Sequence, residues 1–232
     1  MQIVTRSAQL LLDLLFPRKC VACKAEGAWI CPQCQAAVAP KFLFEPVTPS
    51  IFGLFSMEEI VIREAVHALK YNSIYEAAYA LVDTLALATT PQQLRTAWGV
   101  KSVQGAFVPV PVSNKRRKSR GYNQAELLAE AFSPWLGMPI EYHLLERAQG
   151  KTLVGSNRAQ RQLQTFHAFA LAENARVNAQ TAYILIDDVV TTGSTLKVCR
   201  HVLREVGAQN VVGCAFAYRH LDNARDSHSF SG

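Results

Sequence analysis

The spacing of apolar residues predicts mainly helices in the first half of the chain. Leucines recur at helical spacing within residues 5–16, which indicates a short amphipathic helix. Residues 51–57 are apolar and aromatic, and we expect a strand there. Residues 57–70 and 75–88 place apolar side chains on one face at helical spacing, so each predicts a helix. Residues 91–99 predict a break or a short helix before a turn.

From about residue 103 the pattern changes to short apolar runs that alternate with helical segments. The expected strands are residues 106–112, 139–142, 183–186 and 210–217, and the expected helices are residues 125–132, capped by Asn123, and 195–206, followed by Gly207. Residues 146–165 show no regular period. Strands that alternate with helices are typical of a parallel sheet with helices packed on it, so we predict an α/β fold.

Composition narrows the class of protein. The chain has 232 residues, half of them hydrophobic and 18% charged, which permits a large core and excludes global disorder. An apolar run near the start contains Asp13 and is followed by Pro17–Lys19, so it does not resemble a cleavable signal peptide. Since no stretch approaches ~18 apolar residues without a charge, we expect no membrane insertion. These features predict a cytoplasmic protein.

The formal net charge of +6 comes almost entirely from one segment. Five cations lie within six residues: Lys115, Arg116, Arg117, Lys118 and Arg120. Without this segment the chain would be close to neutral. A cluster of this kind suits contact with phosphate groups, but it is equally typical of a solvated loop. Both interpretations stay open on the charge pattern alone.

Four of the six cysteines lie near the N-terminus as two Cys-x2-Cys pairs. They are Cys20, Cys23, Cys31 and Cys34. Two such pairs supply four thiolate ligands for a tetrahedral zinc ion and leave no open position, so we predict a structural zinc site. Two disulfides or free thiols are the alternative, and a reducing cytosol disfavours disulfides. Cys199 and Cys214 lie in apolar surroundings and are expected to be buried core thiols.

Prolines at positions 40, 46 and 49 separate the cysteine segment from the rest of the chain. We therefore expect two domains. Residues 1–45 would hold the amphipathic helix and the four cysteines. Residues 46–232 would form the α/β domain, with its chemical motifs within about residues 103–218.

The segment from Tyr183 to Leu196 carries the clearest chemical signal. An apolar strand leads to two adjacent acids, Asp187 and Asp188, and then to Val-Val-Thr-Thr-Gly-Ser-Thr, which opens a helix. Ligands of open α/β sheets bind at the carboxyl ends of strands. Hydroxyls, backbone N–H groups and a helix N-terminus suit a phosphate, whereas the acids suit the vicinal hydroxyls of an attached sugar. The segment therefore predicts a ribose 5-phosphate site; the alternative is a capped helix after a strand, with two surface acids.

Residues 184–195, Ile-Leu-Ile-Asp-Asp-Val-Val-Thr-Thr-Gly-Ser-Thr, resemble the phosphoribosyl pyrophosphate motif of the type I phosphoribosyltransferases. With the cysteine pairs, His67-Ala-Leu-Lys70-Tyr71 and the segment 110–124, the chain resembles the ComF/GntX family of competence-associated proteins over about residues 15–218. The resemblance implies a type I phosphoribosyltransferase-like parallel sheet flanked by helices, with a small N-terminal zinc-binding module. It also implies a role in natural transformation or in the use of extracellular DNA as a nutrient.

The residue pattern and the resemblance together assign roles to individual residues. Asp187 and Asp188 would hold the ribose hydroxyls, and the 5-phosphate would lie against Val189, Val190, Thr191, Thr192, Gly193, Ser194 and Thr195. The candidates for contact with pyrophosphate or nucleic acid are Ser113, Asn114, Lys115, Arg116 and Arg120. Arg158 and Arg161 would lie on a mobile catalytic loop, in which Leu153 and Gln164 replace the family's usual Gln and Asn. Mg²⁺ would accompany the phosphoribosyl pyrophosphate.

Two functions are consistent with these features. The first is transfer of a ribose 5-phosphate unit with release of pyrophosphate, which needs positioning and charge stabilisation of an oxocarbenium-like transition state. The second is a non-catalytic protein that binds single-stranded DNA or a partner of the competence machinery and keeps the phosphoribosyl site as a sensor or a vestige. Lys70 is expected either at a solvated helix end or in contact with the ligand.

Overall fold

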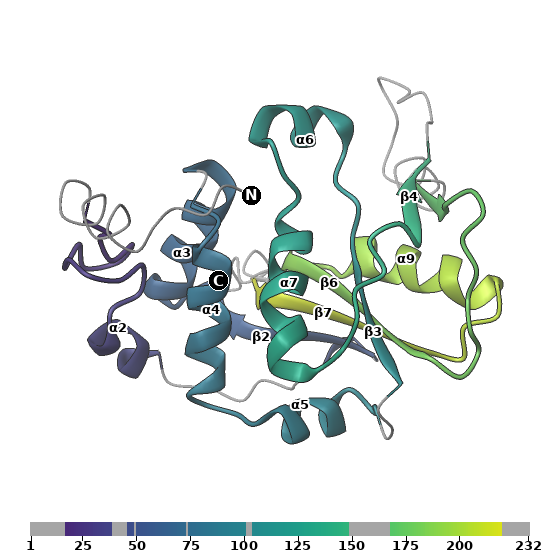
Figure 1. Cartoon of the computed structure of the whole chain (residues 1–232), viewed down its shortest axis with the longest axis horizontal. Coiled ribbons are helices and arrows are strands. Elements are labelled where there is room, and N and C mark those ends of the chain that lie inside the picture. The colour runs from purple at the N-terminus through teal and green to yellow at the C-terminus, as the bar shows by residue number, and fades with distance from the viewer. Residues whose placement is uncertain are drawn as a thin grey trace, which may run out of the picture.

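The computed structural model describes residues 17–38, 46–48, 50–72, 74–100, 104–148 and 168–219. Its centre is a five-stranded sheet in the order β1 (Pro46–Thr48), β2 (Ile51–Ser56), β7 (Asn210–Tyr218), β6 (Ala182–Val190) and β3 (Gly105–Pro109). The last four strands of this order run parallel, and β1 is antiparallel to β2. The expected α/β fold with a parallel sheet is confirmed (Figure 1).

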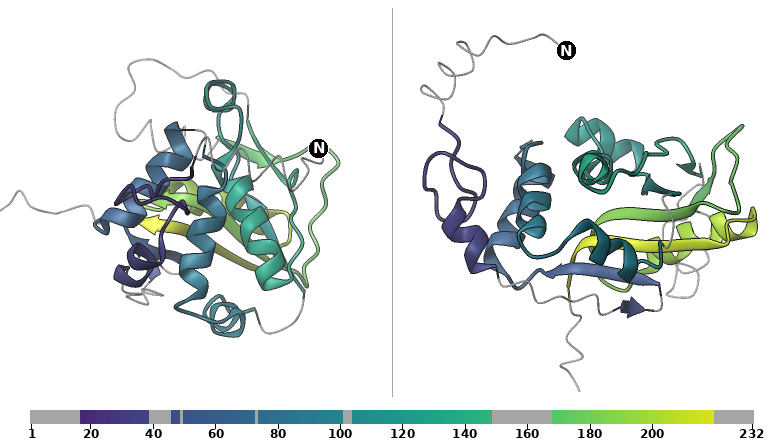
Figure 2. Two further views of the ribbon diagram at one scale, coloured as in Figure 1. Left: turned by 60° about the vertical axis from the view of Figure 1, so that its left-hand side comes forward. Right: turned by 60° about the horizontal axis from the view of Figure 1, so that its bottom comes forward.

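Helices cover both faces of the sheet (Figures 1 and 2). One face carries α3 (Ile60–Tyr71), α4 (Ala77–Ala86), α5 (Pro91–Ala97) and α7 (Gln124–Leu136), and the other carries α9 (Ser194–Glu205) and the small sheet of β4 (Leu145–Arg147) and β5 (Phe169–Leu171). Residues of β6 alternate between the two cores. Ile184 and Ile186 pack in the core with α7, whereas Tyr183 and Leu185 pack in the core with α9.

Aromatic side chains fix α7 against the sheet. The rings of Phe107 in β3 and Phe132 in α7 are buried, with centroids 5.9 Å apart, and Phe216 of β7 lies 6.3 Å from Phe132. Trp98 meets Phe107 edge-on. Burial of each such side chain contributes roughly 1.5–3 kcal/mol. The strand ends that carry the candidate site therefore rest on a closely packed support.

The cysteine segment lies beside α3 and α4 at one end of the molecule (Figures 1 and 2, purple). It ends in the short helix α2 (Pro32–Ala37). Val21, Ile30 and Val38 are buried in the same core as α3 and α4, so the segment packs on the α/β domain. The domain boundary near residue 45 stays a prediction, since residues 39–45 lie outside the described ranges.

The structure corrects the expectation that the basic segment is a loop. Residues 114–120 form a helix, α6 (Asn114–Arg120). Ser113 caps this helix by accepting a hydrogen bond from the backbone N–H of Arg116 at 3.3 Å, and Gly121 ends it with a left-handed backbone (φ 82°). The cations therefore lie on a defined helical surface.

The structure also corrects the expected end of the strand before the acids. We expect the strand to stop at Ile186, but β6 continues to Val190. The continuation occurs because Asp187 pairs with Ala215 and Val190 with Tyr218 of β7. Residues 139–142 form only an isolated bridge between Ile140 and Phe107 rather than the expected strand.

Other predictions of local structure are confirmed or untested. Asn123 caps α7 as expected, accepting from the N–H of Ala125 at 3.1 Å, although α7 continues four residues beyond the expected end at Phe132. The predicted helix at residues 5–16 lies outside the described residues. Within the described part of the chain, every helix is too short or too polar to cross a bilayer.

Candidate functional site

Asp187 and Asp188 lie at the carboxyl end of β6 and turn toward opposite faces of the sheet, as neighbours in a strand must. Asp188 points toward α3, where one of its oxygens, Oδ2, lies 3.1 Å from Nζ of Lys70. The backbone N–H of Asp188 donates to Oδ1 of Asp187 at 2.8 Å. The exposed fractions of the two ion-paired side chains are small, 21% for Lys70 and 14% for Asp188, so solvent screens this pair only weakly.

Burial, and after it the neighbouring charge of Asp188, raise the pKa of Asp187 to about 7, although the Asp188 N–H, Lys70 and Arg116 act to lower it. Asp187 therefore changes charge near neutral pH. A carboxylate of this kind accepts hydrogen bonds from sugar hydroxyls when ionised and holds a proton when the pH falls.

Asp187→Asn is expected to stabilise the ligand-free protein at pH 8. The folded-state pKa of Asp187 lies above its ordinary value of 3.8, so its contribution to the free energy of unfolding is largest below pH 3.8 and is lost as the pH rises toward 7. The gain in Tm should therefore be larger at pH 8 than at pH 5, by several degrees. Thermal unfolding at the two pH values measures this difference in Tm. An equal change at both would contradict the raised pKa of Asp187.

The turn after β6 leads directly into α9. Thr191, Thr192 and Ser194 are exposed, so their hydroxyls face solvent, while Gly193 is buried with a left-handed backbone (φ 73°). The N–H of Ser194 donates to Oγ1 of Thr192 at 3.4 Å. At the base of the turn, the N–H of Arg219 donates to the carbonyl of Val190 at 2.9 Å. The result is an anchored turn whose hydroxyls and N–H groups open toward solvent at the start of a 12-residue helix.

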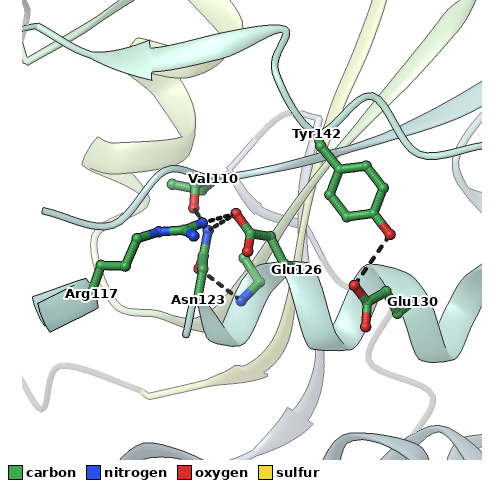
Figure 3. Close-up of polar contacts among 7 residues, drawn as sticks. Val110, Arg117, Asn123, Glu126, Glu130 and Tyr142 are labelled. Carbon is green, nitrogen blue, oxygen red and sulfur yellow. Dashed lines mark hydrogen bonds and ion pairs between the residues drawn. The ribbon is translucent and has the colours of Figure 1, made fainter. Parts of the chain in front are cut away.

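The basic helix α6 is tied to α7 by polar contacts (Figure 3). Arg117 forms an ion pair with Glu126, and Asn123 Nδ2 donates to the carbonyl of Val110 at 3.0 Å. Arg120 donates to Oε1 of Gln124 at 2.9 Å. Among the residues that the structure describes, four cations of α6 make no ion pair within 4.0 Å; they are Lys115, Arg116, Lys118 and Arg120.

The C-terminal end of α6 lies against the end of α3. The guanidinium carbon of Arg120 lies 5.4 Å from the ring centroid of Tyr71, and the hydroxyl of Tyr122 donates to the carbonyl of Leu69. The rings of Tyr75 and Tyr122 meet edge-on at 4.7 Å. These contacts place the basic helix beside Lys70, and hence beside Asp188.

A cavity of about 280 Å³ lies next to the carboxyl end of β3, between α6, the start of α7 and β4. Arg147 of β4 lines it, donates through Nε to the carbonyl of Pro111 at 3.4 Å and lies 4.8 Å above the ring of Phe169. Partial burial and the charge of Arg116 lower the pKa of Arg147, whereas Asp187 raises it. Arg116 of α6, Arg147 of β4 and Asp187 of β6 therefore lie close enough to interact electrostatically.

Sequence reasoning missed Arg147 and left Lys70 undecided. Lys70 occupies the last turn of α3 but is mostly buried, which excludes the solvated helix end. In the sequence, the signal that indicates Lys70 is the segment His67-Ala-Leu-Lys70-Tyr71. Arg147 is the last residue of β4, a three-residue strand that is too short to find by periodicity. Arg158 and Arg161 lie outside the described residues.

The four N-terminal cysteines are brought together as expected. Their sulfur atoms all lie within 4.8 Å of one another, so the cluster can hold a metal ion. Cys20 and Cys34 show the electrostatics of such a cluster. Burial raises the pKa of Cys20, but backbone hydrogen bonds, led by that of Cys23, lower it to about 6; burial and the neighbouring thiols raise the pKa of Cys34 to about 12. Cys199 and Cys214 are buried core thiols, as predicted.

The chain is similar in sequence to proteins whose names refer to competence and to DNA utilization. The chain is 36% identical to competence protein F of Haemophilus influenzae over 107 residues, 46% of this chain and 47% of the relative. It is 35% identical to competence protein ComFC of Streptococcus pneumoniae over 106 residues, 45% of this chain and 44% of the relative. It is 26% identical to DNA utilization protein YhgH of Salmonella typhimurium over 213 residues, 83% of this chain and 85% of the relative.

In sequence, the chain is thus similar to competence proteins and to a DNA utilization protein. The alignments span about half the length of the two competence proteins. No family model matches the chain. Among solved structures, it is similar to adenine phosphoribosyltransferase from Leishmania tarentolae, with a TM-score of 0.37 and 15% identity over 63% of this chain and 72% of that one. A second adenine phosphoribosyltransferase gives a TM-score of 0.38 and 14% identity, over 82% of this chain and 88% of that one.

Proposed function

We propose that this protein belongs to the ComF family, binds phosphoribosyl pyrophosphate and transfers its ribose 5-phosphate unit, in DNA uptake or in the use of extracellular DNA. One observation carries the proposal: an acidic pair at the carboxyl end of a central strand is followed at once by a hydroxyl-bearing turn at the N-terminus of α9. A site for ribose 5-phosphate needs hydrogen-bond acceptors for the ribose hydroxyls and hydrogen-bond donors for the phosphate. The acidic pair supplies the acceptors, and the turn supplies the donors. The competence and DNA-utilization names of the relatives support the cellular context.

Each part of the site has its own role in binding and transfer. Asp187 and Asp188 accept hydrogen bonds from the ribose hydroxyls, and the turn from Thr191 to Ser194 donates to the 5-phosphate. Departure of pyrophosphate from C1 leaves positive charge on the ribose, which the ionised acids stabilise. Arg116 and Arg147, whose charges act on Asp187, would receive the negative leaving group. When bound, Mg²⁺ held largely by the ligand's own oxygens would neutralise part of the diphosphate charge.

Calorimetry with phosphoribosyl pyrophosphate and Mg²⁺ tests the proposal, with a matched pair of glycine variants. Gly193→Ala forces a side chain onto a left-handed residue inside the turn, where its Cβ would lie 3.3 Å from Ile51 Cδ1. We expect Kd to rise roughly tenfold or more, because the N–H donors move. Gly207→Ala imposes a similar backbone strain at the far end of α9, where the Cβ meets open space, and should leave Kd unchanged. Equal effects of both variants would remove the turn from the site.

We also propose that the four N-terminal thiols hold a structural zinc ion. The residues fit the metal: four sulfurs within 4.8 Å of one another agree with a tetrahedral ion bonded to each at about 2.3 Å. With four protein ligands, the ion would stabilise the segment around Cys20–Cys34 without taking part in chemistry. This small module would then depend on the metal for its folding.

A second function, binding of single-stranded DNA, is favoured by the surface around α6. Four cations of α6 make no ion pair among the described residues. Tyr71, 64% exposed, lies against one of them, Arg120, and Tyr75, 46% exposed, lies against Tyr122 just after the helix. Cations that contact phosphates and aromatic rings that stack on bases are the two requirements of a single-strand surface. Sequence reasoning finds few aromatic residues within the basic segment, but the fold brings two more from α3 and the turn after it.

The double variant Lys115→Gln/Lys118→Gln tests this surface. We expect weaker binding to an oligothymidine, and a slope of log K against log salt that falls by roughly 0.7 for each charge removed. Arg204→Gln removes a cation from the distant end of α9 and serves as the control. A salt slope that is the same in the double variant and the wild type would exclude α6 as the contact surface.

A further inference from the structure

We infer that Lys70 is a positioning residue of the sugar site: it holds Asp188 so that one oxygen of each acid stays free for a vicinal pair of ligand hydroxyls. The inference rests on the proposed function and adds a residue and a basis for selectivity to it. Its starting point is the Nζ–Oδ2 distance of 3.1 Å between Lys70 and Asp188, which links α3 to the end of β6.

The hydrogen bonds divide the four carboxylate oxygens evenly. Lys70 engages Oδ2 of Asp188, and the N–H of Asp188 engages Oδ1 of Asp187. Among the described residues, no hydrogen bond or ion pair reaches Oδ1 of Asp188 or Oδ2 of Asp187. Each acid therefore keeps one acceptor oxygen. One acceptor on each of two consecutive residues at the end of β6 matches a ligand with two neighbouring hydroxyls, as in ribose, and one acceptor would stay unpaired with 2-deoxyribose.

Charge gives Lys70 a second effect. Two ionised acids in sequence would repel each other and repel a phosphorylated ligand, and the ammonium of Lys70 cancels one of the two charges. The titratable and charged groups around Asp187, besides its neighbour Asp188, come from four elements: the cations Lys70 of α3, Arg116 of α6 and Arg147 of β4, and the neutral thiol Cys199 of α9. Of the cations, Lys70 is the one in direct contact with an acid of the pair.

The position of Lys70 is fixed by the fold rather than by the ion pair alone. Leu69 is fully buried, and its carbonyl accepts the hydrogen bond from the hydroxyl of Tyr122. The backbone on the N-terminal side of Lys70 is thereby held in place. A side chain that extends from this backbone can hold Asp188 in one orientation before any ligand binds, which lowers the entropy lost on binding.

The test compares Lys70→Met with Lys70→Arg, with Arg63→Gln as a control that removes an exposed cation from the same helix. Calorimetry measures Kd for ribose 5-phosphate and 2-deoxyribose 5-phosphate. We expect the wild type to prefer the ribose compound by about tenfold or more. Lys70→Met should lose most of this preference, Lys70→Arg should restore it, and Arg63→Gln should keep it. An undiminished preference in Lys70→Met overturns the inference; if that variant does not fold, Lys70→Gln replaces it.

A second readout needs no ligand, so it separates this inference from the proposed function. Carbon-13 NMR of the carboxyl groups follows the titration of Asp187. Removal of the Lys70 charge should move that titration to higher pH, since this charge lowers the pKa of Asp187. If the wild type binds neither phosphoribosyl pyrophosphate nor ribose 5-phosphate but the titration moves, the proposed function fails and the electrostatic role of Lys70 stands. A titration that is identical in the wild type and Lys70→Met overturns the inference, whichever ligand the site takes.

Discussion

Asp188→Asn is expected to weaken the binding of phosphoribosyl pyrophosphate at least about tenfold, and Asp187→Asn/Asp188→Asn more than about a hundredfold. The amide keeps the shape of the side chain but loses the charge that accepts strongly from ribose hydroxyls and pairs with Lys70. Calorimetry in the presence of Mg²⁺ gives Kd directly. The affinity should also rise between pH 6 and pH 8 in the wild type, as Asp187 ionises with its pKa of about 7.

The controls separate loss of the site from loss of the fold. Glu205→Gln removes an exposed acid at the far end of α9 and should leave Kd unchanged. Asp187→Asn should flatten the pH dependence of binding, apart from the part that the ligand's own phosphate contributes. Binding that is unchanged in the double variant would show that the acids do not contact the ligand.

Cys31→Ser is expected to remove bound zinc and to unfold the N-terminal module. Structural zinc contributes on the order of 10 kcal/mol to the folding of small domains, so loss of one of four ligands outweighs the apolar contacts that Val21, Ile30 and Val38 make with the core. We expect metal analysis to find about one zinc per chain in the wild type. Thermal unfolding of the variant should begin at a markedly lower temperature.

Cys214→Ala is the matched control. It removes a fully buried thiol from β7 and should lower stability while leaving the zinc content unchanged. Purified wild-type protein that carries no metal, with two disulfides found by mass spectrometry, would contradict the zinc site. Full zinc content in Cys31→Ser would exclude Cys31 as a ligand.

The β6–turn–α9 unit was predictable because its signals are local. An apolar strand, two acids, small hydroxyl residues and an amphipathic helix follow one another within 24 residues, from Ala182 to Glu205. Each signal acts through the backbone of neighbouring residues, by burial, hydrogen bonding at the turn or helix spacing. The extension of β6 to Val190 was not predictable in this way, because it depends on pairing with β7.

Elements stabilised by distant partners were not predictable. The segment of α6 has no apolar stripe, and its helix depends on the Ser113 cap and on contacts of Arg117 and Arg120 with α7. The partner of Lys70 lies in a different half of the chain, so sequence spacing alone does not join it to Asp188. The parts of the site outside the segment from Tyr183 to Leu196, such as Lys70 and α6, are therefore positioned by tertiary contacts.

The most direct test of the sugar-phosphate site is a crystal structure of the protein with phosphoribosyl pyrophosphate and Mg²⁺. The account predicts the 5-phosphate within the turn from Thr191 to Ser194, and the ribose hydroxyls on the free oxygens of Asp187 and Asp188. A ligand bound at another place, or acids that still face only protein groups when the ligand is present, would contradict it.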